Sequence, residues 1–129
     1  MIYITQGMGI GHLLESAAKF EEFRQNLTTE QNKAGAIKSF EYVYEMSWKT
    51  LKRILNKSGY TELKSPREIY RKAAVAGLID DPEIWFHFID MRNLTSHTYS
   101  EENQDKVLDC LPDFSREVQK LITKFKELK

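Results

Sequence analysis

Residues 92–99 read Arg-Asn-Leu-Thr-Ser-His-Thr-Tyr and bring an arginine, a histidine and a tyrosine into one short stretch. Arginine carries a permanent charge on a planar group that fits phosphate, and histidine gains or loses a proton near neutral pH. Arg92 could stabilise a developing negative charge while His97 acts as an acid or a base. A structural arginine–carboxylate pair and a capping histidine would account for the same two residues.

The octapeptide follows an apolar stretch that we expect to form a buried helix, beginning at Asp81-Pro82. On a regular helix Arg92 and His97 lie ~140° apart, whereas Asn93 and His97 share a face. One subunit alone would therefore not direct Arg92 and His97 at one target, but a two-fold dimer that joins two such helix ends would. Such a cleft suits metal-free RNA cleavage, which needs a base for the ribose 2′-hydroxyl, an acid for the 5′-oxygen and a cation for the phosphorane.

A carboxylate on another expected helix is the natural partner of the arginine. Glu41 lies four residues after Ile37, on the side of the helix over residues 33–57 that should face the core. A buried carboxylate needs a partner, so we expect Glu41 to orient Arg92. Glu45, one turn further on, is expected to pair with Lys49 at the i+4 position.

Apolar residues recur every three or four positions along most of the chain, which predicts helices. Ser65, Pro66 and Glu68 form the start signal of one helix, and Pro112 must kink or interrupt the last helical region. That region carries a near-heptad apolar seam over residues 107–128, suited to packing against a helix of this or a second subunit. The pattern predicts an all-α, up-and-down bundle of about five helices.

The composition predicts one soluble globular domain: 129 residues, 41% hydrophobic, 29% charged, with zero net charge. A single cysteine fits a reducing compartment, and no signal peptide or membrane span is evident, so we expect a cytoplasmic protein. The three histidines lack metal-ligand spacing, and no cofactor motif is found. Gly7, Gly9 and Gly11 do not match a dinucleotide-binding loop, so residues 1–12 are interpreted as a flexible leader before a domain at residues 13–129.

Charge is unevenly distributed along the chain. Residues 49–72 contain eight basic and two acidic side chains, a net of +6, and residues 80–109 contain the reverse, a net of −6. A polarised surface of this kind could bind a phosphate backbone on one side and a basic partner on the other. Two halves that attract each other, or ordinary solvated helix faces, would give the same distribution.

The octapeptide resembles the signature of HEPN domains, in which an arginine is followed by a polar residue, a histidine five positions on and a tyrosine two further. Residues 40–49, 65–68 and 85–99, in that order, are similar to successive blocks of the branch found beside minimal nucleotidyltransferases. Members of this branch are described as nucleotidyltransferase substrate-binding proteins. The resemblance extends from about Leu13 to the C-terminus.

The resemblance implies a dimeric helical bundle with a separate minimal nucleotidyltransferase as partner. In toxin–antitoxin pairs of this kind, the HEPN member is a metal-independent endoribonuclease, and its partner silences it by attaching AMP to the motif tyrosine. Carried over, Arg92 and His97 are catalytic, Asn93 is the auxiliary polar residue of the site and Tyr99 is modified. Alternatively, the chain is a non-catalytic subunit that binds substrate or nucleotide for its partner.

Overall fold

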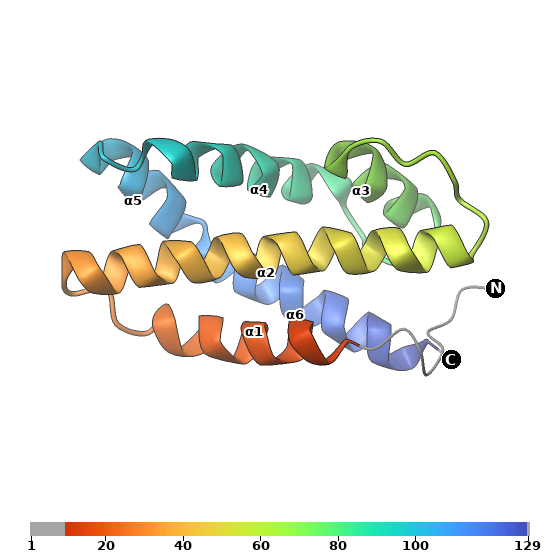
Figure 1. The fold of residues 1–129 in the computed structure, drawn as a ribbon, viewed down its shortest axis with the longest axis horizontal. Coiled ribbons are helices and arrows are strands. Elements are labelled where there is room, and N and C mark those ends of the chain that lie inside the picture. The colour runs from red at the N-terminus through yellow and green to blue at the C-terminus, as the bar shows by residue number, and fades with distance from the viewer. Residues whose placement is uncertain (1–9, 129) are drawn as a thin grey trace.

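The computed structural model describes residues 10–128, and all regular secondary structure in this range is helical (Figure 1). The elements are α1 (Gly11–Phe23), α2 (Glu30–Lys57), α3 (Pro66–Val75), α4 (Pro82–Leu94), the 3₁₀ turn η1 (Thr95–His97), α5 (Glu101–Asp109) and α6 (Leu111–Glu127). The expected all-α bundle is confirmed. The last expected helical region is divided into α5 and α6 at Cys110, and Pro112 lies in the first turn of α6, where its missing N–H leaves no bond unmade.

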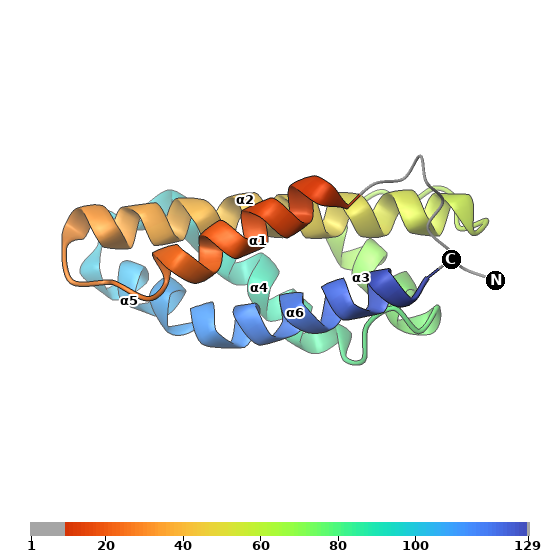
Figure 2. The same cartoon turned by 90° about the horizontal axis from the view of Figure 1, so that it is seen from below.

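The long helix α2 runs the length of the molecule, and the other helices pack along it. Figures 1 and 2 show α1 and α6 beside one flank of α2, with α3, α4 and α5 along another. The helix begins three residues earlier than expected because the Thr29 hydroxyl accepts a hydrogen bond from the Asn32 amide at 3.0 Å. A polar side chain, rather than the first apolar residue of the pattern, therefore sets where α2 begins.

Side-chain caps fix where the shorter helices begin. The Ser65 hydroxyl accepts from the Glu68 amide at 3.2 Å, and the Asp81 carboxylate accepts from the Glu83 amide at 2.9 Å. Each cap is followed by proline in the first helical turn, as the sequence indicated. After α3 the chain reverses at Gly77, whose φ of +80° lies in the left-handed region that favours glycine. These boundaries set the direction of α4, the helix that leads into residues 92–99.

The core is organised around Phe114 of α6. Its ring lies edge-on to Phe20, Phe40 and Phe88, with centroid distances of 5.4, 4.7 and 5.1 Å, and to Trp85 at 6.0 Å. Edge-to-face contacts of this kind add to the free energy gained by burying large rings. The five aromatic residues come from α1, α2, α4 and α6, so this cluster holds α4 at a fixed position against α2.

The expected leader lies mostly outside the described residues. Residues 1–9, which include Gly7 and Gly9, are not described, whereas Gly11 and His12 form the first turn of α1. Helical structure therefore begins two residues before the expected domain start at Leu13. Within residues 10–128, none of the helices has the length and apolar character needed to cross a membrane.

Burial predicts that the single thiol is chemically inert in the folded protein. Cys110 is 4% exposed between α5 and α6, and burial raises the pKa of its thiol to about 12. The thiolate is the reactive form, and at pH 8 only about one thiol in ten thousand would carry it. We expect Ellman's reagent to leave the native protein almost unlabelled and to react with one thiol per chain in concentrated guanidinium chloride, with Cys110→Ser as the blank. Rapid labelling of the native protein would contradict the buried position.

Candidate functional site

The guanidinium of Arg92 lies between two carboxylates of α2. Arg92 Nη2 is 3.7 Å from Glu41 Oε2, and Arg92 Nε is 3.5 Å from Glu45 Oε1. The first distance confirms the expected pairing of Glu41 with Arg92. The second is an ion pair without hydrogen-bond geometry, because Nε is buried and finds no acceptor at the required angle. Glu41 and Glu45 are one turn apart, so one face of α2 offers both carboxylates to the last turn of α4.

The expected pairing of Glu45 with Lys49 is wrong. Glu45 Oε2 instead accepts a hydrogen bond from Trp48 Nε1 at 3.0 Å, while Oε1 faces Arg92. The Lys49 ammonium lies 5.8 Å from the centre of the Trp48 ring, in cation–π contact. The Glu45 carboxylate is therefore fixed from two directions, by Arg92 of α4 and by the Trp48 indole of its own helix.

Thr95 completes the contacts of the arginine and was not identified from the sequence. Its hydroxyl accepts from Arg92 Nη1 at 3.0 Å and donates to the Arg92 carbonyl oxygen at 2.6 Å. Thr95 is buried, and it is the first residue of η1. A threonine three residues after the arginine, where the helix ends, was the only sequence signal for this role. The Arg92 side chain is thus held by groups from α2 and η1.

The electrostatic balance around Arg92 is not strongly positive, since one guanidinium faces two carboxylates. The side chains of Arg92, Glu41 and Glu45 are 30%, 22% and 36% exposed, so water reaches all three. Burial raises the pKa of nearby Tyr44 to about 12, with smaller opposing effects from Glu45, which raises it, and Arg92, which lowers it. The Tyr44 hydroxyl therefore stays protonated at neutral pH and adds no charge.

The chain after Arg92 leaves regular α-helical geometry. Helix α4 ends at Leu94 and η1 covers Thr95–His97, so the regular α-helix assumed in placing Asn93 and His97 on one face is interrupted between them. The His97 carbonyl accepts from Asn103 Nδ2 at 3.1 Å, which ties η1 to α5. Asn103, like Thr95, is a supporting residue that periodicity could not reveal.

The remaining residues singled out in the motif, in α4, in η1 and after it, are exposed. Asn93 and His97 are exposed, and Tyr99 is 88% exposed. The His97 and Tyr99 rings meet edge-to-face, with centroids 6.1 Å apart. Within residues 10–128 no hydrogen bond, ion pair or ring contact joins Arg92 to His97. The structure therefore gathers Glu41, Arg92 and the residues that fix Arg92, and separately pairs the imidazole with the exposed tyrosine.

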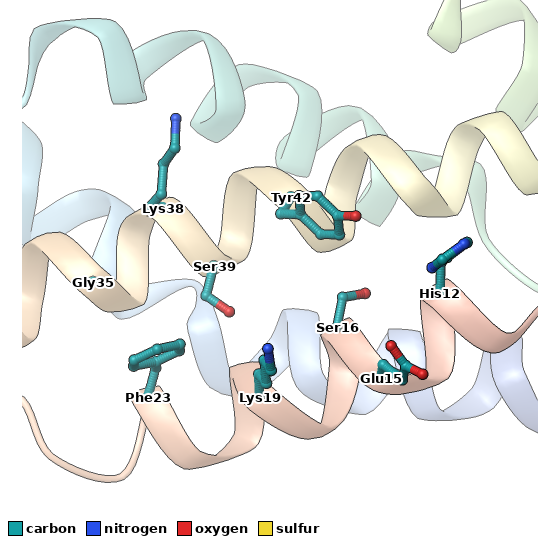
Figure 3. A pocket seen from close by; sticks show the side chains of 9 residues that line it. All are labelled: His12, Glu15, Ser16, Lys19, Phe23, Gly35, Lys38, Ser39 and Tyr42. Atoms are coloured by element: carbon teal, nitrogen blue, oxygen red, sulfur yellow. The ribbon is translucent and has the colours of Figure 1, made fainter.

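A groove of about 370 Å³ lies elsewhere on the molecule, between α1 and α2 (Figure 3). The rings of Phe23 and Tyr42 and the side chains of Lys19 and Lys38 line it. Residues 92–99 are not among its lining residues. The chemistry-bearing residues therefore sit on the open surface around α4, η1 and α5 rather than in this groove.

Comparisons with known proteins agree with this fold. A family model described as "Nucleotidyltransferase substrate binding protein like" matches residues 11–127. The "Probable ribonuclease HepT" of Haemophilus influenzae is 38% identical over 98 residues, which are 73% of this chain and 67% of that protein.

Two solved structures are similar over nearly their whole length. One is a Haemophilus influenzae protein described as revealing the fold of a substrate binding domain of a nucleotidyltransferase, with a TM-score of 0.82 and 30% identity over 92% of this chain and 100% of that one. The other is a protein of Thermus thermophilus, with a TM-score of 0.83 and 27% identity over 89% of this chain and 99% of that one. Because the family model spans nearly all of the described residues, the chain belongs to the nucleotidyltransferase substrate-binding family of HEPN domains.

Proposed function

We propose that this chain is the HEPN partner of a minimal nucleotidyltransferase and acts as a metal-independent endoribonuclease of a toxin–antitoxin pair. The observation that carries the proposal is the placement of Arg92, fixed by Glu41, Glu45 and Thr95, one short turn before the exposed His97. A fixed cation and, one short turn further along the chain, an imidazole open to solvent are groups that phosphodiester cleavage needs. The similarity to a protein named as a ribonuclease supports the same chemistry.

In the proposed reaction two copies of the chain form the cleft. The imidazole of one His97 takes the proton of a ribose 2′-hydroxyl, whose oxygen attacks the adjacent phosphorus. The second His97 gives a proton to the 5′-oxygen as its bond to phosphorus breaks, so the two proton transfers balance. Arg92 stabilises the charge of the phosphorane, and Asn93 supplies a polar contact to the RNA. A two-fold dimer would supply the two imidazoles that this scheme uses, together with two Arg92 guanidinium groups.

Removing either charged group of the motif should abolish cleavage. With EDTA present, we expect the protein to cut single-stranded RNA, and Arg92→Ala and His97→Ala to reduce the rate by about a hundredfold or more, as for loss of an acid–base group. His87→Ala is the matched control, because His87 is also an exposed histidine and lies on α4, the helix that leads into the motif. Rates would be read from end-labelled RNA on denaturing gels. Intact RNA at high protein concentration, or full activity of His97→Ala, would contradict the nuclease.

The two carboxylates beside Arg92 should affect turnover more than RNA binding. Glu41→Gln and Glu45→Gln keep the shape of each side chain but weaken its hold on the guanidinium, so we expect kcat to fall about tenfold to a hundredfold through misplacement. KM should not rise, since less negative charge faces the RNA. Glu22→Gln, on the exposed face of α1, is the control. Unchanged kcat in both variants, with folding verified by circular dichroism, would rule out the positioning role.

Tyr99 is the residue proposed to switch the activity off. Its hydroxyl oxygen would attack the α-phosphorus of ATP on the nucleotidyltransferase, forming an ester as the bond to pyrophosphate breaks and the tyrosine proton leaves. The product places a negative phosphodiester beside His97, whose ring is 6.1 Å from that of Tyr99. The added charge and bulk would repel the RNA backbone.

Mass spectrometry after co-expression with the partner tests this switch. We expect the mass of at least one adenylyl group on Tyr99, none on Tyr99→Phe, and loss of RNA cleavage in the modified protein. Tyr42→Phe is the control, because Tyr42 is another exposed tyrosine (54% exposed) and lies elsewhere, on α2. A shift that survives in Tyr99→Phe would move the modification to another residue.

The pairing of Arg92 with two carboxylates favours one second candidate, a non-catalytic subunit that binds substrate or nucleotide for the nucleotidyltransferase. In that case the arginine is a structural link between α2 and α4. RNA would then stay intact in the cleavage assay, and nucleotide transfer by the partner would depend on this chain. The same purified proteins therefore separate the two functions.

A further inference from the structure

Two arginines of α3 are stacked on one aromatic ring of α4. The guanidinium carbons of Arg67 and Arg71 lie 4.4 and 5.3 Å from the centre of the Phe86 ring. Phe86 is 8% exposed, whereas both arginines are exposed, so the ring forms a floor beneath two charges that face solvent. Cation–π contact holds both charged groups over the same small area.

Repulsion between the two positive charges opposes this arrangement. Like charges at i and i+4 on a helix repel each other, and Arg67 stands in the first turn of α3, where the helix dipole disfavours a cation. Within residues 10–128, no carboxylate lies at ion-pair distance from either guanidinium. An anion between the two side chains would neutralise the repulsion, and the planar guanidinium groups match the oxygens of phosphate.

The proposed cleavage site does not itself provide enough positive charge to hold RNA. Arg92 faces two carboxylates, and residues 80–109, which include α4 and α5, have a net charge of −6. Binding to a nucleic-acid backbone is dominated by cations that neutralise phosphates. An RNA that reaches His97 therefore needs a second group of cations nearby.

We infer that Arg67 and Arg71, held on Phe86, form a phosphate subsite that binds the RNA backbone beside the proposed cleavage site. The inference rests on the proposed function for the identity of the ligand. Phe86 lies six residues before Arg92 on α4, a rise of about 9 Å and a separation of about 120° around the helix axis, so the bound strand would have to pass around α4 over a few nucleotides to reach the motif. Lys64 and Lys72 flank the pair in sequence and extend the basic region of residues 49–72.

RNA binding by a protein that cannot cut it tests the subsite directly. In a His97→Ala background, fluorescence anisotropy with a labelled single-stranded RNA in EDTA would compare the parent with Arg67→Gln/Arg71→Gln. We expect binding to weaken at least ~10-fold, as for loss of charge-assisted contacts. The slope of log affinity against log salt should flatten by about 0.7, the value for one phosphate of a single strand neutralised by the pair.

Two further variants separate the subsite from charge in general. Lys124→Gln/Lys126→Gln removes the same number of charges from the last turn of α6 and should change RNA affinity less than about twofold, because neither lysine is stacked on Phe86. Phe86→Leu keeps both arginines but removes the ring, and we expect an intermediate loss, with folding verified by thermal melting. Equal losses in the lysine and arginine pairs would overturn the proposal, as would unchanged affinity in Arg67→Gln/Arg71→Gln.

The outcomes distinguish this inference from the proposed nuclease. RNA that is bound through the arginine pair but never cut by the unmutated chain would keep the subsite and remove the nuclease. RNA that is cut with the same KM by the parent and by Arg67→Gln/Arg71→Gln would keep the nuclease and remove the subsite. Polyglutamate and unlabelled RNA would also be compared as competitors at equal concentrations of negative charge. If polyglutamate displaced the labelled RNA at a far lower charge concentration than unlabelled RNA does, the subsite would be overturned, because the arginine pair would then be a contact for an acidic protein.

Discussion

The contact between Arg92 and the two carboxylates of α2 is the interaction on which the rest of the site depends. Aromatic packing around Phe114 sets α4 against α2, and the last turn of α4 then meets Glu41 and Glu45. The three side chains are partly exposed, so such pairs contribute about 1 kcal/mol or less each to folding. Their effect is mainly on geometry: Arg92 is fixed where the helix ends and η1 begins.

Much of this architecture follows from the sequence. Helical periodicity, the caps at Ser65 and Asp81, and the facing of Glu41 toward Arg92 could be predicted, and all of them appear in the structure. The partner of Glu45 could not be obtained in this way. Local rules favour Lys49 at i+4, whereas the partner observed is Arg92, which lies far along the chain and comes close only once α4 has packed.

The turn after Arg92 marks a second limit of reasoning from periodicity. An uninterrupted α-helix would place Asn93 and His97 on one face, but the chain tightens into a 3₁₀ turn at Thr95. The Thr95 hydroxyl bonds both to the Arg92 side chain and to its carbonyl oxygen, which stabilises the end of the helix at that point. A side chain that hydrogen-bonds to the last carbonyl groups of a helix can change the direction of the residues that follow. A calculation of helix faces from sequence spacing does not include this effect.

The charge distribution explains how one site could bind RNA and still be easy to silence. If cations that hold the backbone lie on α3, the motif itself needs only enough positive charge to stabilise a transition state. Arg92 faces two carboxylates, so the formal charge of these three side chains already sums to −1. One further negative group on the exposed Tyr99 would then add to the negative charge around the motif. Acidic surroundings weaken RNA binding at the motif itself, and for the same reason a single added negative charge on Tyr99 would be enough to prevent it.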